Sequence, residues 1–286
     1  MRGDASTRPG HAPAVVAQVL DALALPLARQ RRRPLRVGLS GLQGSGKSTL
    51  AQQLAAACGR RGIDAVVLSL DDFYLGRRAR LLLARQVHPL LATRGVPGTH
   101  DVALLMRTLA ALAHASERAP VRVPRFDKGR DTRLPPSRWR VVSAPPRLVL
   151  LEGWCVGVPA QSQAALRRPL NALERDADPH AIWRNWVNRH LAGAYARLWR
   201  QLDRLVLLQA PDFASARRWR ARAERPRCER GARHAMTASE LARFMQHYER
   251  LSRHALATLP ARADLCLELD ARHRVRAVHV PAAHCR

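Results

Sequence analysis

The residues with the clearest chemistry form one glycine-rich stretch, Gly41-Leu42-Gln43-Gly44-Ser45-Gly46-Lys47-Ser48-Thr49. It follows an apolar run from Leu35 to Leu39, opens a helix-like segment from Ser48 to Arg61, and has the G-x-x-x-x-G-K-[ST] spacing of a phosphate-binding loop. Glycines let peptide N–H groups approach phosphate oxygens, and the N-terminus of the helix adds partial positive charge at the same place. Lys47 can reach the β- and γ-phosphates, and the Ser48 hydroxyl can ligate Mg²⁺. The stretch predicts a bound nucleoside triphosphate, held by Gly41, Gln43, Gly44, Ser45, Gly46, Lys47, Ser48 and Thr49.

Carboxylates follow two further apolar runs that are typical of buried strands. The run Val66–Leu70 leads into Asp71-Asp72-Phe73-Tyr74, and the run Leu148–Leu151 ends in Glu152. Open α/β sheets place their ligands at the carboxyl ends of parallel strands. Asp71 can accept a proton from a substrate hydroxyl there, and Glu152 has the Walker B position beside Mg²⁺. Either Asp71 or Asp72 can instead cap the next helix. We favour Asp71 for catalysis.

Lysine is rare in this chain, and its positions are informative. Of 49 basic residues only Lys47 and Lys128 are lysines, a ratio that a coding bias toward arginine explains without reference to any partner. Lys128 lies in the charged segment 127–133, directly after a strand-like stretch from Val121 to Phe126. The charges of this segment can pair off as a solvated turn. The position after a strand favours an active-site loop instead.

Two other segments carry candidate side chains. The segment His88–Asp101 contains two prolines and two glycines, so it is expected to be a defined loop, and it holds Arg94 and His100. Asp101 can contact substrate or act as N-cap of a helix over 102–112. The segment 211–234 contains eight arginines, which can neutralise a transferring phosphoryl group from a lid over about 211–236 or form a solvated helical face.

Composition narrows the class of protein. The net charge of +27 would be compatible with a nucleic-acid partner. Against that interpretation, the arginines are spread over the whole chain and no nucleic-acid-binding motif is recognisable. A basic NTPase associated with nucleic acid remains the rival class. The five cysteines are odd in number and form no C-x-x-C pair, which fits reduced thiols. No apolar run reaches membrane-spanning length, so we expect a cytoplasmic protein without a membrane partner.

The remaining pattern predicts one α/β domain over residues 1–286. An N-terminal helical extension is expected over 1–34, with a helix from Ala14 that ends at Pro26. Apolar spacing predicts a helix over 182–202 and a further helix of about twenty residues capped by Thr237. Strands are expected over 204–209, 265–269 and 275–280.

These motifs together resemble a known family. The glycine-rich loop, the Asp71 segment and the strand ending in Glu152 are similar to the P-loop small-molecule kinases that include uridine kinase, phosphoribulokinase and pantothenate kinase. Further short sequence motifs resemble those of the plant and fungal type of D-glycerate 3-kinase and its bacterial relatives. They are Arg94-Gly95-Val96-Pro97-Gly98-Thr99-His100-Asp101, Phe126-Asp127-Lys128, Glu152-Gly153-Trp154-Cys155-Val156-Gly157, Trp219-Arg220 to Glu224, and Met236-Thr237 ahead of Phe244. The resemblance runs from about Leu35 to Leu269.

The resemblance implies a fold, an activity and roles for single residues. The fold would be α/β, a P-loop kinase with a parallel five-stranded β-sheet flanked by helices and an arginine-rich lid. The activity would transfer the γ-phosphoryl group of ATP, with Mg²⁺, to a hydroxyl of D-glycerate, giving 3-phosphoglycerate and ADP. Uridine, pantothenate or another sugar acid is the alternative acceptor. Lys47, Asp71, Lys128 and Glu152 would be catalytic, with Asp71 as base and with Ser48 and Glu152 at the metal. Substrate contacts would fall to Asp71, Tyr74, Arg94, His100, Lys128 and Arg220. The chain departs from the family at Ala223, where a glutamine is common, and in the arginine content of the lid.

Overall fold

A six-stranded sheet forms the centre of the molecule. The structure, a computed structural model, describes residues 10–229 and 236–281. The strand order is β10-β9-β8-β1-β7-β2. The strands are β1 (Leu35–Gly41), β2 (Ala65–Ser69), β7 (Leu148–Gly153), β8 (Arg204–Gln209), β9 (Leu265–Leu269) and β10 (Val275–His279). The first five run parallel to one another, and β10 pairs antiparallel with β9. The predicted α/β class is therefore confirmed, with one antiparallel edge strand beyond the five parallel strands.

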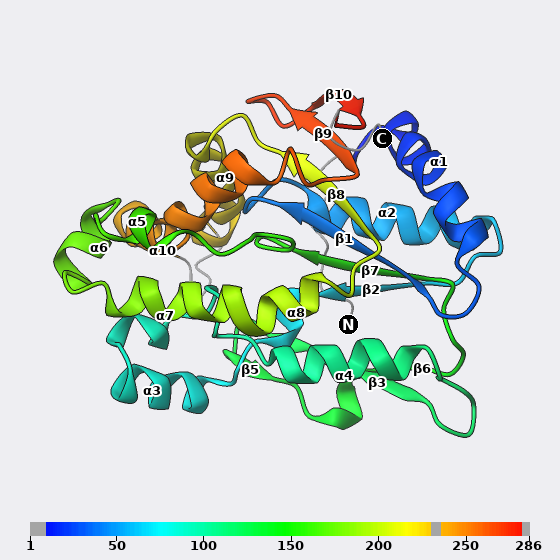
Figure 1. Ribbon diagram of the computed structural model, residues 1–286, viewed down its shortest axis with the longest axis horizontal. Coiled ribbons are helices and arrows are strands. Elements are labelled where there is room, and N and C mark those ends of the chain that lie inside the picture. The colour runs from blue at the N-terminus through cyan, green and yellow to red at the C-terminus, as the bar shows by residue number, and fades with distance from the viewer. Residues whose placement is uncertain (1–9, 230–235, 282–286) are drawn as a thin grey trace.

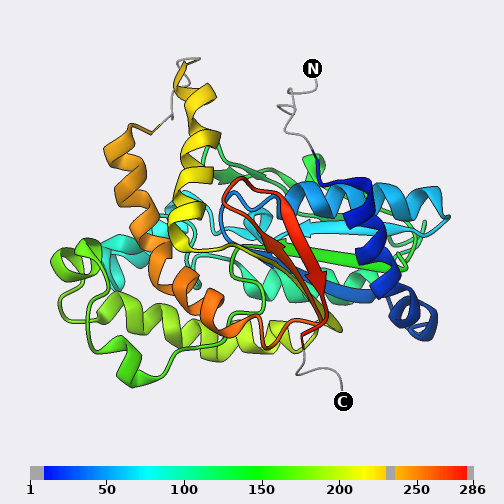
Figure 2. The same ribbon diagram turned by 90° about the horizontal axis from the view of Figure 1, so that it is seen from above.

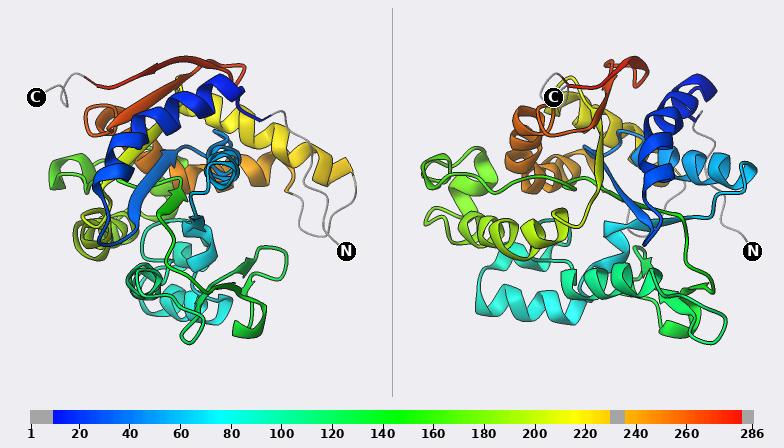
Figure 3. Two further views of the ribbon diagram at one scale, coloured as in Figure 1. Left: turned by 90° about the vertical axis from the view of Figure 1, so that its right-hand side faces the viewer. Right: turned by 45° about the vertical axis from the view of Figure 1, so that its right-hand side comes forward.

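Helices cover both faces of this sheet (Figure 1). The two views in Figure 3 show α1 (Pro13–Arg29) and α2 (Lys47–Arg60) on one face, and α7 (Ile182–His190) with α10 (Ala238–Thr258) on the other. The other helices are α3 (Arg77–Gln86), α4 (Val102–Leu112), α5 (Gln163–Leu166), α6 (Ala172–Ala177), α8 (Ala196–Trp199) and α9 (Phe213–Glu229). Every residue of β7 is buried, because helices cover the centre of the sheet on both sides. Across the described residues, no helix is both long enough and apolar enough to cross a bilayer.

Three predicted elements differ from those observed. The first helix does not end at Pro26 but continues to Arg29, since Leu23 and Leu27 on either side of the proline are buried in the core. Tertiary packing here outweighs the hydrogen bond that the proline ring removes. The predicted helix over 182–202 is divided by a π-helical segment, Leu191–Tyr195, between α7 and α8.

The predicted strand over 121–126 is two short strands instead of one. Pro124, which has no N–H to donate to a ladder, separates β3 (Val121–Val123) from β4 (Phe126–Asp127). Strand β3 pairs with β6 (Arg140–Val142), and β4 pairs with β5 (Thr132–Arg133). The β4–β5 hairpin thus presents its connecting loop, residues 128–131, as a separate unit.

The parallel register brings the predicted site residues to one edge of the sheet. Strand β7 lies between β1 and β2, with Glu152 opposite Leu39 on one side and Ser69 on the other. The P-loop follows β1, and a short 3₁₀ helix, Leu70–Phe73, follows β2 and carries Asp71. Three neighbouring strand ends therefore deliver the loop, Asp71 and Glu152 to the same place.

Candidate active site

The P-loop has the backbone conformation that its glycines predict. Gly44 and Gly46 have φ angles of +82° and +88°, a region that residues with a Cβ rarely adopt. A Cβ on Gly44 would lie 2.9 Å from the Cβ of Trp219, and one on Gly46 would lie 2.9 Å from Nε2 of His11. The glycines therefore allow the backbone conformation of the turn and also the close approach of Trp219 and His11 to it. Helix α2 begins directly at Lys47, which leaves its N-terminal amides beside the loop.

A cavity of about 360 Å³ lies beside this loop and collects most of the predicted site. Its walls come from the P-loop, the segment after β2, the 88–101 loop, the β4–β5 hairpin, the end of β7, and helices α9 and α10. The lining residues are Gln43, Gly44, Lys47, Ser48, Asp71, Tyr74, Arg94, Lys128, Glu152, Trp154, Arg220, Phe244 and Tyr248. Both lysines of the chain are among them. The sequence prediction that separate segments form one site agrees with this geometry.

Glu152 lines the cavity and is hydrogen-bonded to two hydroxyl groups. Glu152 is 5 % exposed, and its Oε1 accepts hydrogen bonds from Ser48 Oγ at 3.0 Å and from Ser69 Oγ at 2.5 Å. Ser69 was not predicted, although its position as the last residue of β2 is a usable signal. A hydroxyl beside a carboxylate suits Mg²⁺, which takes oxygen ligands and shares them with substrate phosphates. Within the described chain, no group of three or more His, Cys, Asp or Glu side chains could hold a metal ion by itself.

Buried polar atoms of the P-loop also fit a phosphate ligand. Within the described residues, both amide atoms of the Gln43 side chain and the Ser45 hydroxyl are buried without a hydrogen-bond partner. Buried polar groups without partners are uncommon and call for an explanation such as a ligand. Together with the glycine cradle, these atoms are consistent with a triphosphate on the loop.

Asp71 and Lys128, which both line the cavity, form an ion pair. Lys128 Nζ donates to Asp71 Oδ2 at 2.6 Å, and the Tyr74 hydroxyl donates to Asp71 Oδ1 at 2.8 Å. Burial raises the pKa of Asp71, but the charge and hydrogen bond of Lys128, the charge of Lys47 and the Tyr74 hydroxyl outweigh it and lower the pKa to about 2. Burial lowers the pKa of Lys128, and the Asp71 carboxylate more than offsets it, so the net shift is upward. Both groups are therefore charged at neutral pH.

The two neighbouring aspartates have different roles. Asp72 Oδ1 accepts the backbone N–H of Phe126 at 2.9 Å, which joins the turn after β2 to the β4–β5 hairpin. Asp71 alone of the pair lines the cavity. Neither aspartate caps the helix that follows, because the N-cap of α3 is Gly76 and receives no side-chain hydrogen bond, so the capping alternative is wrong for both.

A buried arginine fixes the loop that carries Lys128. Arg80 of α3 is 1 % exposed and, with Arg94, donates to the carboxylate of Asp131. Arg94 also donates to the backbone carbonyl of Lys128 at 3.1 Å. Arg130 pairs locally with Asp127, as the solvated-turn alternative proposed, but Lys128 and Asp131 pair with distant segments, which positions Lys128. Arg80 was missed because nothing in its basic helical segment distinguishes it from its neighbours.

The structure places His100 outside the cavity lining. Its ring stacks on that of Tyr74 with centroids 4.5 Å apart, and its Nδ1 shares a 2.6 Å hydrogen bond with the Tyr195 hydroxyl. Burial lowers the pKa of His100 to about 4, against an opposing effect of the Asp71 carboxylate. This neutral ring supports Tyr74 from behind. The neighbouring Asp101 is the N-cap of α4, since its Oδ1 accepts the Leu104 N–H at 2.9 Å.

Helices α9 and α10 close the remaining side. Arg220 of α9 lines the cavity and pairs with Glu224 at 2.5 Å. Tyr248 of α10 donates to the Arg94 carbonyl at 3.0 Å, and Trp154 donates to the Gly95 carbonyl at 3.0 Å. Trp154 directly follows the Walker B strand, which could have marked it, whereas Tyr248 has no such signal in the sequence. The range predicted for the lid, about 211–236, contains α9, and its residues 230–235, with two of the eight arginines, lie outside the described residues.

A sheet with a P-loop after β1, a Walker B acid on β7 and a cavity beside the loop indicates a P-loop protein that binds a nucleoside triphosphate. No model of a known protein family matches the chain. The chain is 34% identical over 259 residues to the uncharacterized kinase mug58 of Schizosaccharomyces pombe, which covers 83% of this chain and 87% of that protein. It is 33% identical over 200 residues to the chloroplastic D-glycerate 3-kinase of Arabidopsis thaliana, which covers 67% of this chain and 41% of that protein.

A solved structure agrees in fold. The D-glycerate 3-kinase of Cryptococcus neoformans is similar with a TM-score of 0.76 at 23% identity, over 94% of this chain and 100% of that one. The chain belongs to the family of ATP-dependent P-loop kinases whose members include mug58 and the plant D-glycerate 3-kinase.

Proposed function

We propose that the protein transfers the γ-phosphoryl group of ATP to a hydroxyl of D-glycerate, giving 3-phosphoglycerate and ADP. The named relatives in plant and fungus support the acceptor, and the Lys128–Asp71 ion pair carries the argument from this chain's own residues. An acceptor with both a carboxylate and a hydroxyl can engage both partners of that pair at once. D-glycerate has both groups within three carbons.

The donor half of the site consists of the P-loop and its neighbours. The loop amides, Lys47 and the α2 N-terminus would bind the β- and γ-phosphates. Ser48 and Glu152 would hold Mg²⁺, which neutralises charge on the phosphates when bound. Arg220 also lines the cavity and would neutralise charge on the transferring group.

The acceptor half depends on an exchange of partners at Asp71. The glycerate carboxylate would bind Lys128 and Arg94, which loosens the hold of Lys128 on Asp71. Because Lys128 accounts for much of the low pKa of Asp71, loss of that contact raises the pKa and makes the carboxylate a better proton acceptor. Asp71 would then orient the attacking hydroxyl and accept its proton, with Tyr74 fixing the other carboxylate oxygen.

The size and charge of the cavity favour a small anionic acceptor such as D-glycerate over a neutral nucleoside. About 360 Å³ must hold both the γ-phosphate and the acceptor. Lys47, Arg94, Lys128 and Arg220 face it, against Asp71 and Glu152. A small anion compensates this excess of positive charge, whereas a neutral nucleoside such as uridine leaves it in place.

A coupled assay of ADP release tests the acceptor. D-glycerate is compared with uridine, pantothenate and ribulose 5-phosphate at equal concentration, with Mg²⁺ and ATP. We expect turnover with D-glycerate and little with the others. Absence of turnover with D-glycerate, while another acceptor reacts, would exclude the proposal.

The position of phosphorylation needs a separate readout. The product is offered to phosphoglycerate kinase, which consumes 3-phosphoglycerate, or to enolase, which consumes 2-phosphoglycerate. We expect signal only with the first coupling enzyme. A signal with enolase alone would show that the 2-hydroxyl of glycerate is phosphorylated instead of the 3-hydroxyl.

A further inference from the structure

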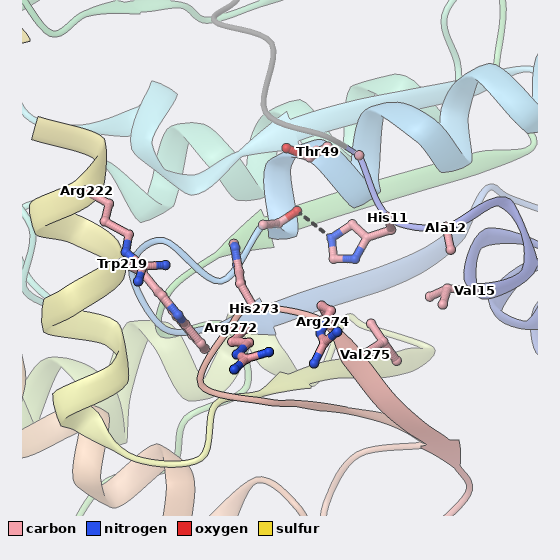
Figure 4. A pocket seen from close by; sticks show the side chains of 12 residues that line it. His11, Ala12, Val15, Thr49, Trp219, Arg222, Arg272, His273, Arg274 and Val275 are labelled. Carbon is pink, nitrogen blue, oxygen red and sulfur yellow. Dashed lines mark hydrogen bonds between the residues drawn. The ribbon is translucent and has the colours of Figure 1, made fainter. Parts of the chain in front are cut away.

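The chain segment before α1 is fastened to the P-loop. His11 Nε2 donates a hydrogen bond to the Gly46 carbonyl at 3.2 Å, since a carbonyl can only accept, and Figure 4 draws this contact as a dashed line. Burial lowers the pKa of His11, against an opposing effect of the Gly46 carbonyl, so at neutral pH the ring has a single N–H, on Nε2. The contact joins residues that are 35 positions apart in the chain.

Two further hydrogen bonds hold the backbone of His11 in place. The Gln53 side chain of α2 accepts the His11 N–H at 3.0 Å and donates to the His11 carbonyl at 2.9 Å. A Cβ on Gly10 would lie 2.5 Å from Nε2 of Gln53, so a side chain there would displace this clasp. Helix α1 follows and buries Val19 and Leu23 in the core. Figure 2 shows α1 crossing α2, with the segment before α1 near the start of α2. The ring therefore reaches the loop from a fixed backbone.

The Gly46 carbonyl sets the direction of an amide that can bind phosphate. A trans peptide group is planar, and its C=O and N–H point in opposite directions. The Gly46 carbonyl shares its peptide group with the N–H of Lys47, one of the first amides of α2, which have no acceptor within the helix. The carbonyl accepts the Leu50 N–H at 2.9 Å as well as His11. With the carbonyl held in this way, the Lys47 N–H points out of the start of α2, where helices bind anions.

This peptide group has particular need of an outside contact. Gly46 has φ +88° and no Cβ, so local steric contacts restrict its backbone less than they restrict other residues. Hydrogen bonds that follow one another also polarise one another. A donor on the Gly46 carbonyl therefore both orients the Lys47 N–H and makes it a stronger donor to a phosphate oxygen.

From this geometry we propose that His11 is a positioning residue of the phosphate site. Its hydrogen bond to the Gly46 carbonyl holds the Lys47 N–H in the direction that binds the donor's phosphates. The inference rests on the proposed kinase function for its ligand, the triphosphate, and not on the identity of the acceptor. It gives the segment before α1 a part in nucleotide binding.

The competing role for His11 is a direct contact with the nucleoside. The ring also lines a second cavity beside the loop, with a volume of about 660 Å³ (Figure 4). Inorganic tripolyphosphate separates the two roles, because it has phosphates and no nucleoside. A positioning role predicts equal effects on tripolyphosphate and ADP, whereas a nucleoside contact predicts an effect on ADP alone.

Calorimetric titration of the full chain with each probe, with Mg²⁺ and without any acceptor, tests the proposal. His11→Ala removes the donor, and His11→Gln supplies a side-chain amide that can donate to the same carbonyl. The matched control is His254→Ala, because Nε2 of His254 also bonds a backbone carbonyl, that of Pro159, at 3.2 Å and His254 lines neither cavity. We expect His11→Ala to weaken both probes about tenfold. His11→Gln should restore most of the affinity, and the control should change nothing.

The two lysines of the chain provide a spectroscopic readout. Labelling lysine with ¹⁵N gives backbone amide signals from Lys47 and Lys128 only, and Lys128→Arg identifies each of them. We expect the Lys47 signal to shift in His11→Ala, because the polarisation of its peptide group changes. In His11→Gln, which has no ring, the signal should return toward its wild-type position. The Lys128 signal should stay in place in both variants.

Several results would overturn the proposal. Loss of ADP affinity with unchanged tripolyphosphate affinity in His11→Ala would assign His11 to the nucleoside. Equal losses in His11→Ala and His11→Gln would assign the effect to packing of the ring and not to its hydrogen bond. Wild-type affinities and an unmoved Lys47 signal in His11→Ala, or a wild-type chain that does not bind tripolyphosphate, would exclude the positioning role. Because no acceptor is present, these outcomes are independent of whether glycerate is phosphorylated.

Discussion

Replacement of Asp71 by asparagine is the sharpest test of the proposed mechanism. The change keeps the size of the side chain and an oxygen to accept the Tyr74 hydroxyl, which lies 2.8 Å from Oδ1. It removes the negative charge that holds Lys128 at 2.6 Å and the site that would accept the proton. The substitution does not alter the P-loop amides or the hydrogen bond between Ser48 and Glu152.

The expected effect falls on turnover and not on nucleotide binding. Loss of a positioned general base costs about 10²- to 10⁴-fold in kcat, which is about 3 to 5 kcal/mol in activation free energy. Nucleotide affinity should stay within about threefold, or about 0.6 kcal/mol. The measurements are coupled ADP release with D-glycerate for kcat and calorimetric titration of ADP for binding.

Asp72→Asn is the matched control for this experiment. An asparagine there can still accept the Phe126 N–H through its oxygen, so we expect less than about a tenfold change in kcat. Turnover of Asp71→Asn near that of the wild type would remove Asp71 from the role of base. If kcat fell equally in both variants, the cause would be a disturbance of the turn after β2 and not the loss of the Asp71 carboxylate.

Three further predictions concern the acceptor, the metal and stability. Lys128→Met should raise the KM for D-glycerate about a hundredfold in steady-state assays while ADP affinity stays close to that of the wild type, because a charge-assisted contact to the carboxylate is lost. An unchanged KM would contradict it. Glu152→Gln should raise the Mg²⁺ concentration for half-maximal ADP release about 10- to 100-fold, and an unaltered Mg²⁺ titration would exclude Glu152 from the metal site. Burial lowers the pKa of His100 to about 4, so between pH 6.5 and 4 the unfolded chain binds a proton that the folded chain does not, and the stability from this group falls as pH falls. The stability advantage of the wild type over His100→Gln in urea unfolding should therefore shrink by about 2 kcal/mol from pH 7 to pH 5, whereas an equal difference at both values would contradict the lowered pKa.

Elements whose signals are local could be predicted closely from the sequence. Strand β8 and helix α4 have the predicted bounds, because an apolar run and an Asp101 cap respectively define them within a few residues. The capping box of Thr237 and Glu240 likewise marks the start of α10. The residues of the donor half of the candidate site could be located for the same reason. The P-loop follows strand β1 and Glu152 lies near the end of strand β7, and the apolar runs in the sequence mark both strands.

Contacts that depend on tertiary packing could not be predicted. The pairing of Arg80 with Asp131 joins segments 51 positions apart, and nothing local separates Arg80 from other arginines of its helix. Tyr248 reaches the Arg94 carbonyl from the middle of α10 for a similar reason. His100 belongs to a sequence motif, but the motif does not show the direction of its ring. The ring stacks on Tyr74, a residue that is distant in the sequence, so its place outside the cavity lining could not be predicted.

The confinement of both lysines to one cavity has a consequence for handling the protein. Reagents that acylate amines, including common cross-linkers, surface-coupling chemistries and fluorophore esters, find lysine side chains only at Lys47 and Lys128. Lys128 is 59 % exposed at its side chain, so it is open to such reagents. Apart from an α-amino terminus, amine labelling of this chain is therefore directed at two lysines that line the candidate active site.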